Sequence, residues 1–154
     1  MAKKIFILVI GIFIFSCGDN DFKYTVPRAP VDFKVQLNGA DNALNSFWGH
    51  KRYDKEGNYG YNQYVGYSGL LVFCYGFDES GFPELNAFDL CCPYEDLVSV
   101  RVVANNEGKA TCTGCKSVYD LTSGFPDSGP SKERLQMYPV TRQLPYSGVY
   151  YIHN

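Results

Sequence analysis

Alternation of apolar and polar side chains along the chain predicts β-strands. Val31, Phe33, Val35 and Leu37 are separated by single polar residues, the period-two pattern of a strand with one buried face. Residues 70–75 are continuously apolar, which is typical of a strand buried on both faces. Further strands are expected at residues 85–90, 98–102, 109–111, 118–121, 134–140 and 149–152. Beyond the N-terminal segment no stretch of ten residues has helical periodicity, so we expect a small all-β sandwich or barrel.

The first sixteen residues follow a different pattern. Lys3 and Lys4 precede an apolar run of about eleven residues, the length of a signal-peptide core and too short to span a bilayer. Cys17 follows the small Ser16 where the run ends, which resembles the lipobox of a bacterial lipoprotein; an ordinary secretory signal is the alternative. The expected division is a signal peptide at 1–16, a lipidated tether at 17–28 and one β domain at 29–154.

Charge narrows the range of partners. The chain has a net charge of −2, and loss of residues 1–16 removes two lysines and no acidic residue, which makes it −4. A mildly acidic chain without a basic run is a poor partner for nucleic acid or for anionic lipid. We therefore expect an exported protein held at the outer membrane by the lipid on Cys17, on its periplasmic or cell-surface side.

Five cysteines follow Cys17, an odd number that leaves at least one unpaired if all pairing is internal. Cys74 lies within the apolar run 70–75 and is expected to be a buried free thiol. The other four lie in two short loops, each preceded by a predicted strand: Cys91 and Cys92 in the first, Cys112 and Cys115 in the second. Two thiol-bearing loops on a β scaffold can hold a metal or an iron–sulfur cluster.

These loops resemble the cluster-binding loops of Rieske iron–sulfur proteins. That family has C-x-H in its first loop, C-x-x-H-G-S-x-[FY] in its second, and then G-x4-G-P with a leucine five residues later. Here the first loop reads Cys92-Pro93-Tyr94, with tyrosine in place of histidine, and the second runs from Cys112 to Tyr119. In the second loop Cys115 replaces histidine and Lys116 replaces glycine. The segment after the loops matches in full at Gly124, Gly129, Pro130 and Leu135.

The mature chain as a whole is similar to Rieske-like lipoproteins of Bacteroidetes-type bacteria. The resemblance implies a [2Fe-2S] or metal-binding electron-transfer module without enzymatic activity, whose ligands are Cys92, Cys112 and Cys115. Tyr94 would stand at a ligand position, and Ser117 and Tyr119 would donate hydrogen bonds to the centre. His50 and His153 are the only histidines and match neither loop, so a conventional Rieske centre is not expected.

Several occupants of the site remain open from the sequence. Cys91 can complete a four-thiolate site for a cluster or zinc only if the loop bends sharply, because neighbouring strand residues point to opposite faces. Tyr94 can serve as a phenolate ligand, or water can complete a three-cysteine site. A disulfide from Cys91 or Cys92 to Cys112 or Cys115 would instead close a loop of about twenty residues, contributing about 3 kcal/mol.

That last alternative describes a cofactor-free binding or structural lipoprotein. Its contact surface would be the tyrosine-rich segment 53–67, since tyrosine combines apolar area with a polar tip suited to a protein or glycan partner. The same tyrosines can equally fill the faces of strands. No nucleophile elbow, phosphate-binding loop, dinucleotide fingerprint or zinc-protease helix occurs, so catalysis has no visible constellation.

Overall fold

The computed structural model describes residues 25–144 and 147–154, and it is all-β as the sequence predicts. Twelve strands form three antiparallel four-stranded sheets within these residues. The expected signal peptide 1–16, and Cys17 with it, lie outside the described residues. No helix in the described part of the chain is long and apolar enough to cross a membrane.

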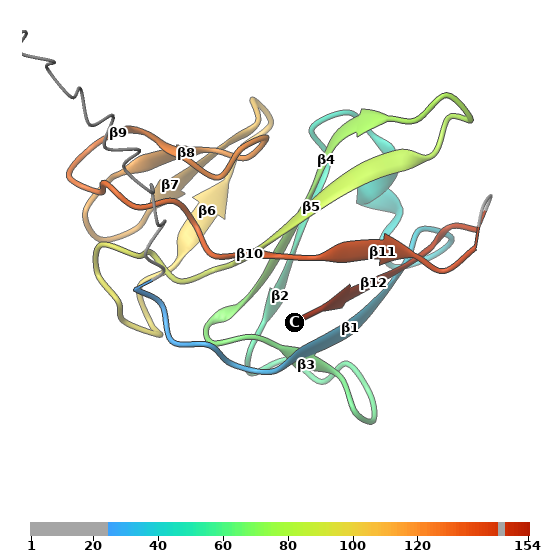
Figure 1. The fold of residues 1–154 in the computed structure, drawn as a ribbon, viewed down its shortest axis with the longest axis horizontal. Coiled ribbons are helices and arrows are strands. Elements are labelled where there is room, and N and C mark those ends of the chain that lie inside the picture. Colours follow the sequence, from blue (N-terminus) through green and yellow to red (C-terminus); the bar gives the residue numbers. More distant parts are fainter. Residues whose placement is uncertain (1–24, 145–146) are drawn as a thin grey trace, which may run out of the picture.

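The second of the three sheets lies between the first and the third (Figure 1). The first has the order β11 (Val140–Arg142), β12 (Val149–His153), β1 (Val31–Gln36), β3 (Tyr64–Val65). The second has the order β10 (Met137–Tyr138), β5 (Pro83–Asp89), β4 (Gly69–Phe77), β2 (His50–Asp54). The third, a separate lobe in Figure 1, has the order β6 (Val102–Ala104), β7 (Lys109–Cys112), β8 (Val118–Asp120), β9 (Pro126–Ser128). A single 3-10 turn, η1 (Asn42–Asn45), follows β1.

Strand β4 separates two hydrophobic cores. Leu70, Val72 and Cys74 belong to a core shared with the first sheet, whereas Leu71 and Phe73 belong to a core shared with the third. Alternate side chains of a strand point to opposite faces, so a strand between two cores must be apolar at every position. The expectation that residues 70–75 are buried on both faces is therefore confirmed. Cys92, Cys112 and Tyr119 lie in the second core.

Two strand predictions need correction. Residues 98–100 form no strand; β6 begins only at Val102, and Val98 is exposed. No regular ladder forms at 98–100: Val100 N–H donates to the Leu97 carbonyl, the Ser68 hydroxyl donates to the Val98 carbonyl, and only the Val100 carbonyl accepts a distant N–H, that of Cys92. The strand expected at 134–140 is divided at Pro139, where the chain passes from β10 in the second sheet to β11 in the first.

The tyrosine-rich segment divides between core and surface. Tyr53 is buried, and the rings of Tyr53 and Tyr59 pack against each other and against Phe33. Tyr61 is 96% exposed and Tyr64 is 52% exposed. The segment thus fills a strand face with some of its tyrosines and presents others to solvent.

The carboxylate of Asp41 fastens the turn after β1 to β2. It accepts hydrogen bonds from the Lys51 ammonium (2.8 Å), the Tyr53 hydroxyl (2.8 Å) and the Gln36 N–H (2.7 Å). Burial raises the pKa of Asp41, but the three donors together lower it by a larger amount. The pKa of Asp41 therefore lies below its ordinary value of 3.8. An acid with a lowered folded-state pKa contributes stability above its ordinary pKa and loses it as pH falls through the folded-state pKa.

Asp41→Asn is therefore expected to lower the free energy of unfolding by about 1–2 kcal/mol at pH 7, as for loss of hydrogen bonds to a charged acceptor. The difference between variant and wild type should shrink as pH falls below 3.8, because the wild-type carboxylate then becomes protonated. Urea unfolding at a series of pH values measures both effects. Asp32→Asn on the exposed face of β1 is the control and should change neither. A difference that stays constant down to low pH would contradict the assigned role.

Candidate metal centre

The first cysteine loop is a tight turn at the end of β5. The Cys92 carbonyl accepts hydrogen bonds from the N–H groups of Glu95 (3.2 Å) and Asp96 (3.0 Å), which reverses the chain. Asp96 adopts a left-handed φ of 47°, a conformation that Asp tolerates better than most residues. At the base of the loop the Asp89 carboxylate accepts the Cys91 N–H at 2.8 Å. Thr25, within the expected tether 17–28, donates its hydroxyl to the Pro93 carbonyl (2.9 Å) and so anchors the loop from outside.

The second loop connects β7 to β8. Cys112 closes the loop by donating its N–H to the Ser117 carbonyl at 2.9 Å. Lys116 takes a left-handed φ of 63°, where the Rieske pattern has glycine, and its ammonium folds back onto the Thr113 carbonyl (2.7 Å). Thr113 N–H donates to the Arg101 carbonyl at 3.0 Å. This last bond ties the second loop to the segment that leaves the first.

The two loops bring three sulfur atoms together. The Sγ atoms of Cys92, Cys112 and Cys115 all lie within 4.8 Å of one another, and those of Cys92 and Cys115 are 3.7 Å apart. Cys92 and Cys112 are fully buried, whereas Cys115 is partly exposed. The structure thus brings the three cysteines expected to bind metal to a single point at the edge of the second core. We call these residues the cysteine triad.

The five described cysteines are all free thiols, so no disulfide joins the loops in this structure. The 3.7 Å between Cys92 and Cys115 compares with a disulfide bond length of about 2.05 Å. Cys74 is buried and free, as its place in the apolar run predicts. Cys91 is buried but lies outside the triad; its thiol donates to the Leu97 carbonyl at 3.5 Å. Although adjacent in the chain, Cys91 and Cys92 thus have different partners.

Two hydroxyl groups contact the sulfurs of the triad. The Tyr119 hydroxyl lies 3.2 Å from the Cys92 sulfur, and the Ser117 hydroxyl 3.1 Å from the Cys115 sulfur. Both residues are fully buried, and the Ser131 N–H holds the Ser117 oxygen at 3.0 Å. Gly129 packs against Ser117 so closely that a Cβ on it would lie 2.5 Å from the Ser117 Cα. The glycine-proline segment thus fixes the position of the serine hydroxyl.

The surroundings shift the pKa values of the Cys112 and Cys115 thiols in opposite directions. Burial raises the pKa of Cys112 to about 12, and its hydrogen bond with Cys92 adds to this, although the N–H groups of Cys115 and Gly114 act against it. At Cys115 burial also raises the pKa, but hydrogen bonds from the Ser117 hydroxyl and backbone, together with Cys112 and Cys92, bring it below its ordinary value. Cys115 is therefore the thiol of this pair that ionises more readily, and the thiolate is the form that binds metal.

Other expected residues lie around the triad rather than in it. Tyr94 is 56% exposed and lines a small cavity beside the glycine-proline segment together with Pro130 and Lys132. Neither histidine joins the triad: among the described residues, the only group of clustered histidine, cysteine and acidic side chains is the three cysteines. His50 lies in β2 and His153 in β12.

Glu95 is a residue that the motif comparison did not identify. A Cβ on Gly114 would lie 2.8 Å from the Glu95 Oε1, so the carboxylate of the first loop rests against the backbone of the second. The only sequence signal is its spacing, three residues after Cys92, which mirrors the spacing of Cys115 from Cys112. Glu95 therefore places a carboxylate beside the loop that carries two of the thiols, without belonging to the triad.

Fold and geometry thus define an all-β protein with three clustered thiols between two loops. Comparisons of the chain with known families, with curated proteins and with solved structures found no match.

Proposed function

We propose that this protein is an exported module that binds one thiophilic metal ion, iron or zinc, through the thiolates of the cysteine triad. The observation that carries the proposal is the 3.7 Å between the sulfurs of Cys92 and Cys115. Metal–sulfur bonds of about 2.3 Å in a tetrahedral site place two sulfur ligands about 3.8 Å apart. The lowered pKa of Cys115 also suits a site whose ligands must ionise on binding.

The ligand set decides which centre the site can hold. Three thiolates supply three of the four positions of a tetrahedral ion, and sulfur ligands favour iron or zinc over hard cations such as magnesium. A [2Fe-2S] centre of the Rieske type needs two imidazoles, and neither His50 nor His153 joins the triad. An iron form would carry one electron, and a lipid on Cys17 would keep it at a membrane; a zinc form would be structural.

Elemental analysis of protein purified without oxygen tests this proposal. The expected result is one metal ion per chain without acid-labile sulfide, and a sulfur-to-metal charge-transfer band when cobalt replaces it. A content of two irons and two sulfides per chain would contradict a single ion and indicate an iron–sulfur cluster. Fully reduced protein that takes up neither zinc, iron nor cobalt would overturn the proposal and favour the disulfide-stapled binding module.

Tyr119→Phe is expected to weaken metal binding about ten-fold, because the variant loses a hydroxyl 3.2 Å from the Cys92 sulfur that would donate to the thiolate of the metal-bound form, while the ring keeps its place in the core. Competition with a chelator of known affinity measures the change. Tyr53→Phe is the matched control, since Tyr53 is also a buried tyrosine but donates to Asp41. Equal affinities for the two variants would show that the Tyr119 hydroxyl does not act on the centre.

A further inference from the structure

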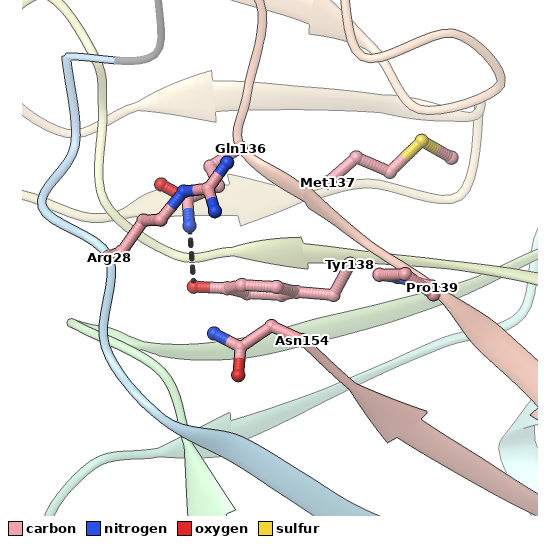
Figure 2. A pocket seen from close by; sticks show the side chains of 6 residues that line it. All are labelled: Arg28, Gln136, Met137, Tyr138, Pro139 and Asn154. Carbon is pink, nitrogen blue, oxygen red and sulfur yellow. Dashed lines mark hydrogen bonds between the residues drawn. The ribbon is translucent and has the colours of Figure 1, made fainter.

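A second cavity lies away from the cysteine triad, where the segment before β1 passes the end of β12 and the chain leading into β10. Its volume is about 480 Å³, within the range of small-molecule sites. Figure 2 shows the side chains that surround it. They are Arg28, Gln136, Met137, Tyr138, Pro139 and Asn154.

A buried acceptor without a donor is among the groups that line this cavity. Gln136 is 6% exposed, and its Oε1 has no hydrogen-bond partner among the described residues. The Gln136 Nε2 donates to the Tyr138 hydroxyl at 3.2 Å, and that hydroxyl donates in turn to Asp89 at 2.8 Å. Because the Tyr138 proton is used on Asp89, the amide cannot reverse and offer its oxygen to Tyr138. A buried acceptor left unpaired costs about 1–3 kcal/mol, and a bound donor would recover this.

A cation lines the same cavity. Arg28 is among the residues that surround it together with Gln136, and Figure 2 draws both side chains. No carboxylate within residues 25–144 and 147–154 forms a salt bridge with Arg28. The planar guanidinium binds a carboxylate through two parallel hydrogen bonds, so it favours that group over other anions of similar size. Asn154 does not compete for such a ligand, because its amide already bonds Val31 N–H and the Ala29 carbonyl.

We propose that this cavity binds a free α-amino acid with an apolar side chain. The carboxylate pairs with Arg28, the ammonium group donates to the Gln136 Oε1, and the side chain contacts the apolar ring of Pro139. An acceptor and a cation that line one cavity match a ligand whose donor and carboxylate lie on adjacent atoms. The inference is independent of the metal centre, because no cysteine lines the cavity.

Calorimetric titration with L-leucine and two matched analogues tests the proposal. 4-Methylpentanoate lacks the ammonium group, and L-leucinamide lacks the carboxylate. Leucine is expected to bind, and each analogue is expected to bind at least ten-fold more weakly because one of its two polar contacts is lost. Absence of binding by leucine up to about 10 mM would overturn the proposal, as would equal affinity for leucinamide.

Variants connect the binding to the cavity. Arg28→Gln should weaken leucine binding at least ten-fold while leaving the weak affinity for leucinamide unchanged, since leucinamide has no carboxylate to lose. Lys132→Gln removes an exposed cation outside the cavity and should leave both affinities unchanged. Gln136→Leu tests the acceptor. If this buried substitution impairs folding, the Arg28 variant still decides, and leucine binding that Arg28→Gln leaves intact would refute the assignment.

Discussion

Cys112→Ser is expected to reduce the affinity for metal at least about a hundred-fold. Binding free energies of structural zinc sites are about 10–16 kcal/mol in total, so one of four ligands corresponds to about 3 kcal/mol, and each 1.4 kcal/mol is ten-fold. Cys112 is suited to this test because, like Cys92, it is fully buried. Chelator competition with cobalt or zinc measures the loss.

Cys91→Ser is the matched control for this experiment. Cys91 is a buried cysteine beside Cys92, but its thiol donates to the Leu97 carbonyl on the far side of the loop. The variant should bind metal like the wild type, with a small loss of stability at most, because a serine hydroxyl can donate to the same carbonyl. Metal loss in Cys91→Ser equal to that in Cys112→Ser would place Cys91 among the ligands and overturn the assigned triad.

Gly129→Ala is expected to lower the free energy of unfolding by about 3 kcal/mol. Gly129 has a left-handed φ of 92°, and its added Cβ would lie 2.5 Å from the Cα and 2.8 Å from the Oγ of Ser117. Backbone strain and steric overlap each cost about 1–3 kcal/mol, and the contact is with backbone that cannot move without shifting the second cysteine loop. Urea unfolding of the metal-free, reduced protein measures the effect.

A second glycine separates the two contributions. Gly81 has a similar φ of 79°, but a Cβ there would meet nothing within 4 Å. Gly81→Ala therefore reports the backbone strain alone and should cost about 1 kcal/mol. Equal losses in the two variants would show that the contact between Gly129 and Ser117 does not strain the loop.

Much of this architecture could be predicted from the sequence because it depends on local periodicity. The uninterrupted apolar run of β4 requires two covered faces, and the structure provides two cores. The adjacency of Cys91 and Cys92 indicates that they point in opposite directions, and the triad contains only the second. These features follow from the two-residue period of a strand, which needs no knowledge of its partners.

Contacts between distant segments could not be predicted in the same way. The hydrogen bond between Tyr138 and Asp89 joins residues 49 positions apart and depends on the register of β10 against β5. The approach of Glu95 to Gly114 depends on how two turns face each other. At Val98 the sequence predicts a strand that the structure does not contain. The apolar–polar alternation there fits a strand, but the Ser68 hydroxyl donates to the Val98 carbonyl and the segment forms a turn.

Lys116 affects the net charge around the proposed metal centre. Three thiolates around a divalent ion carry one net negative charge, and the Lys116 ammonium, folded onto Thr113 within the same loop, cancels it. A glycine at this position, which would adopt the left-handed conformation without strain, would leave that charge exposed. The Glu95 carboxylate against the same loop adds one negative charge, so the face around the metal stays slightly negative. A partner with a basic docking surface would be attracted to it, and its association rate should fall as ionic strength rises.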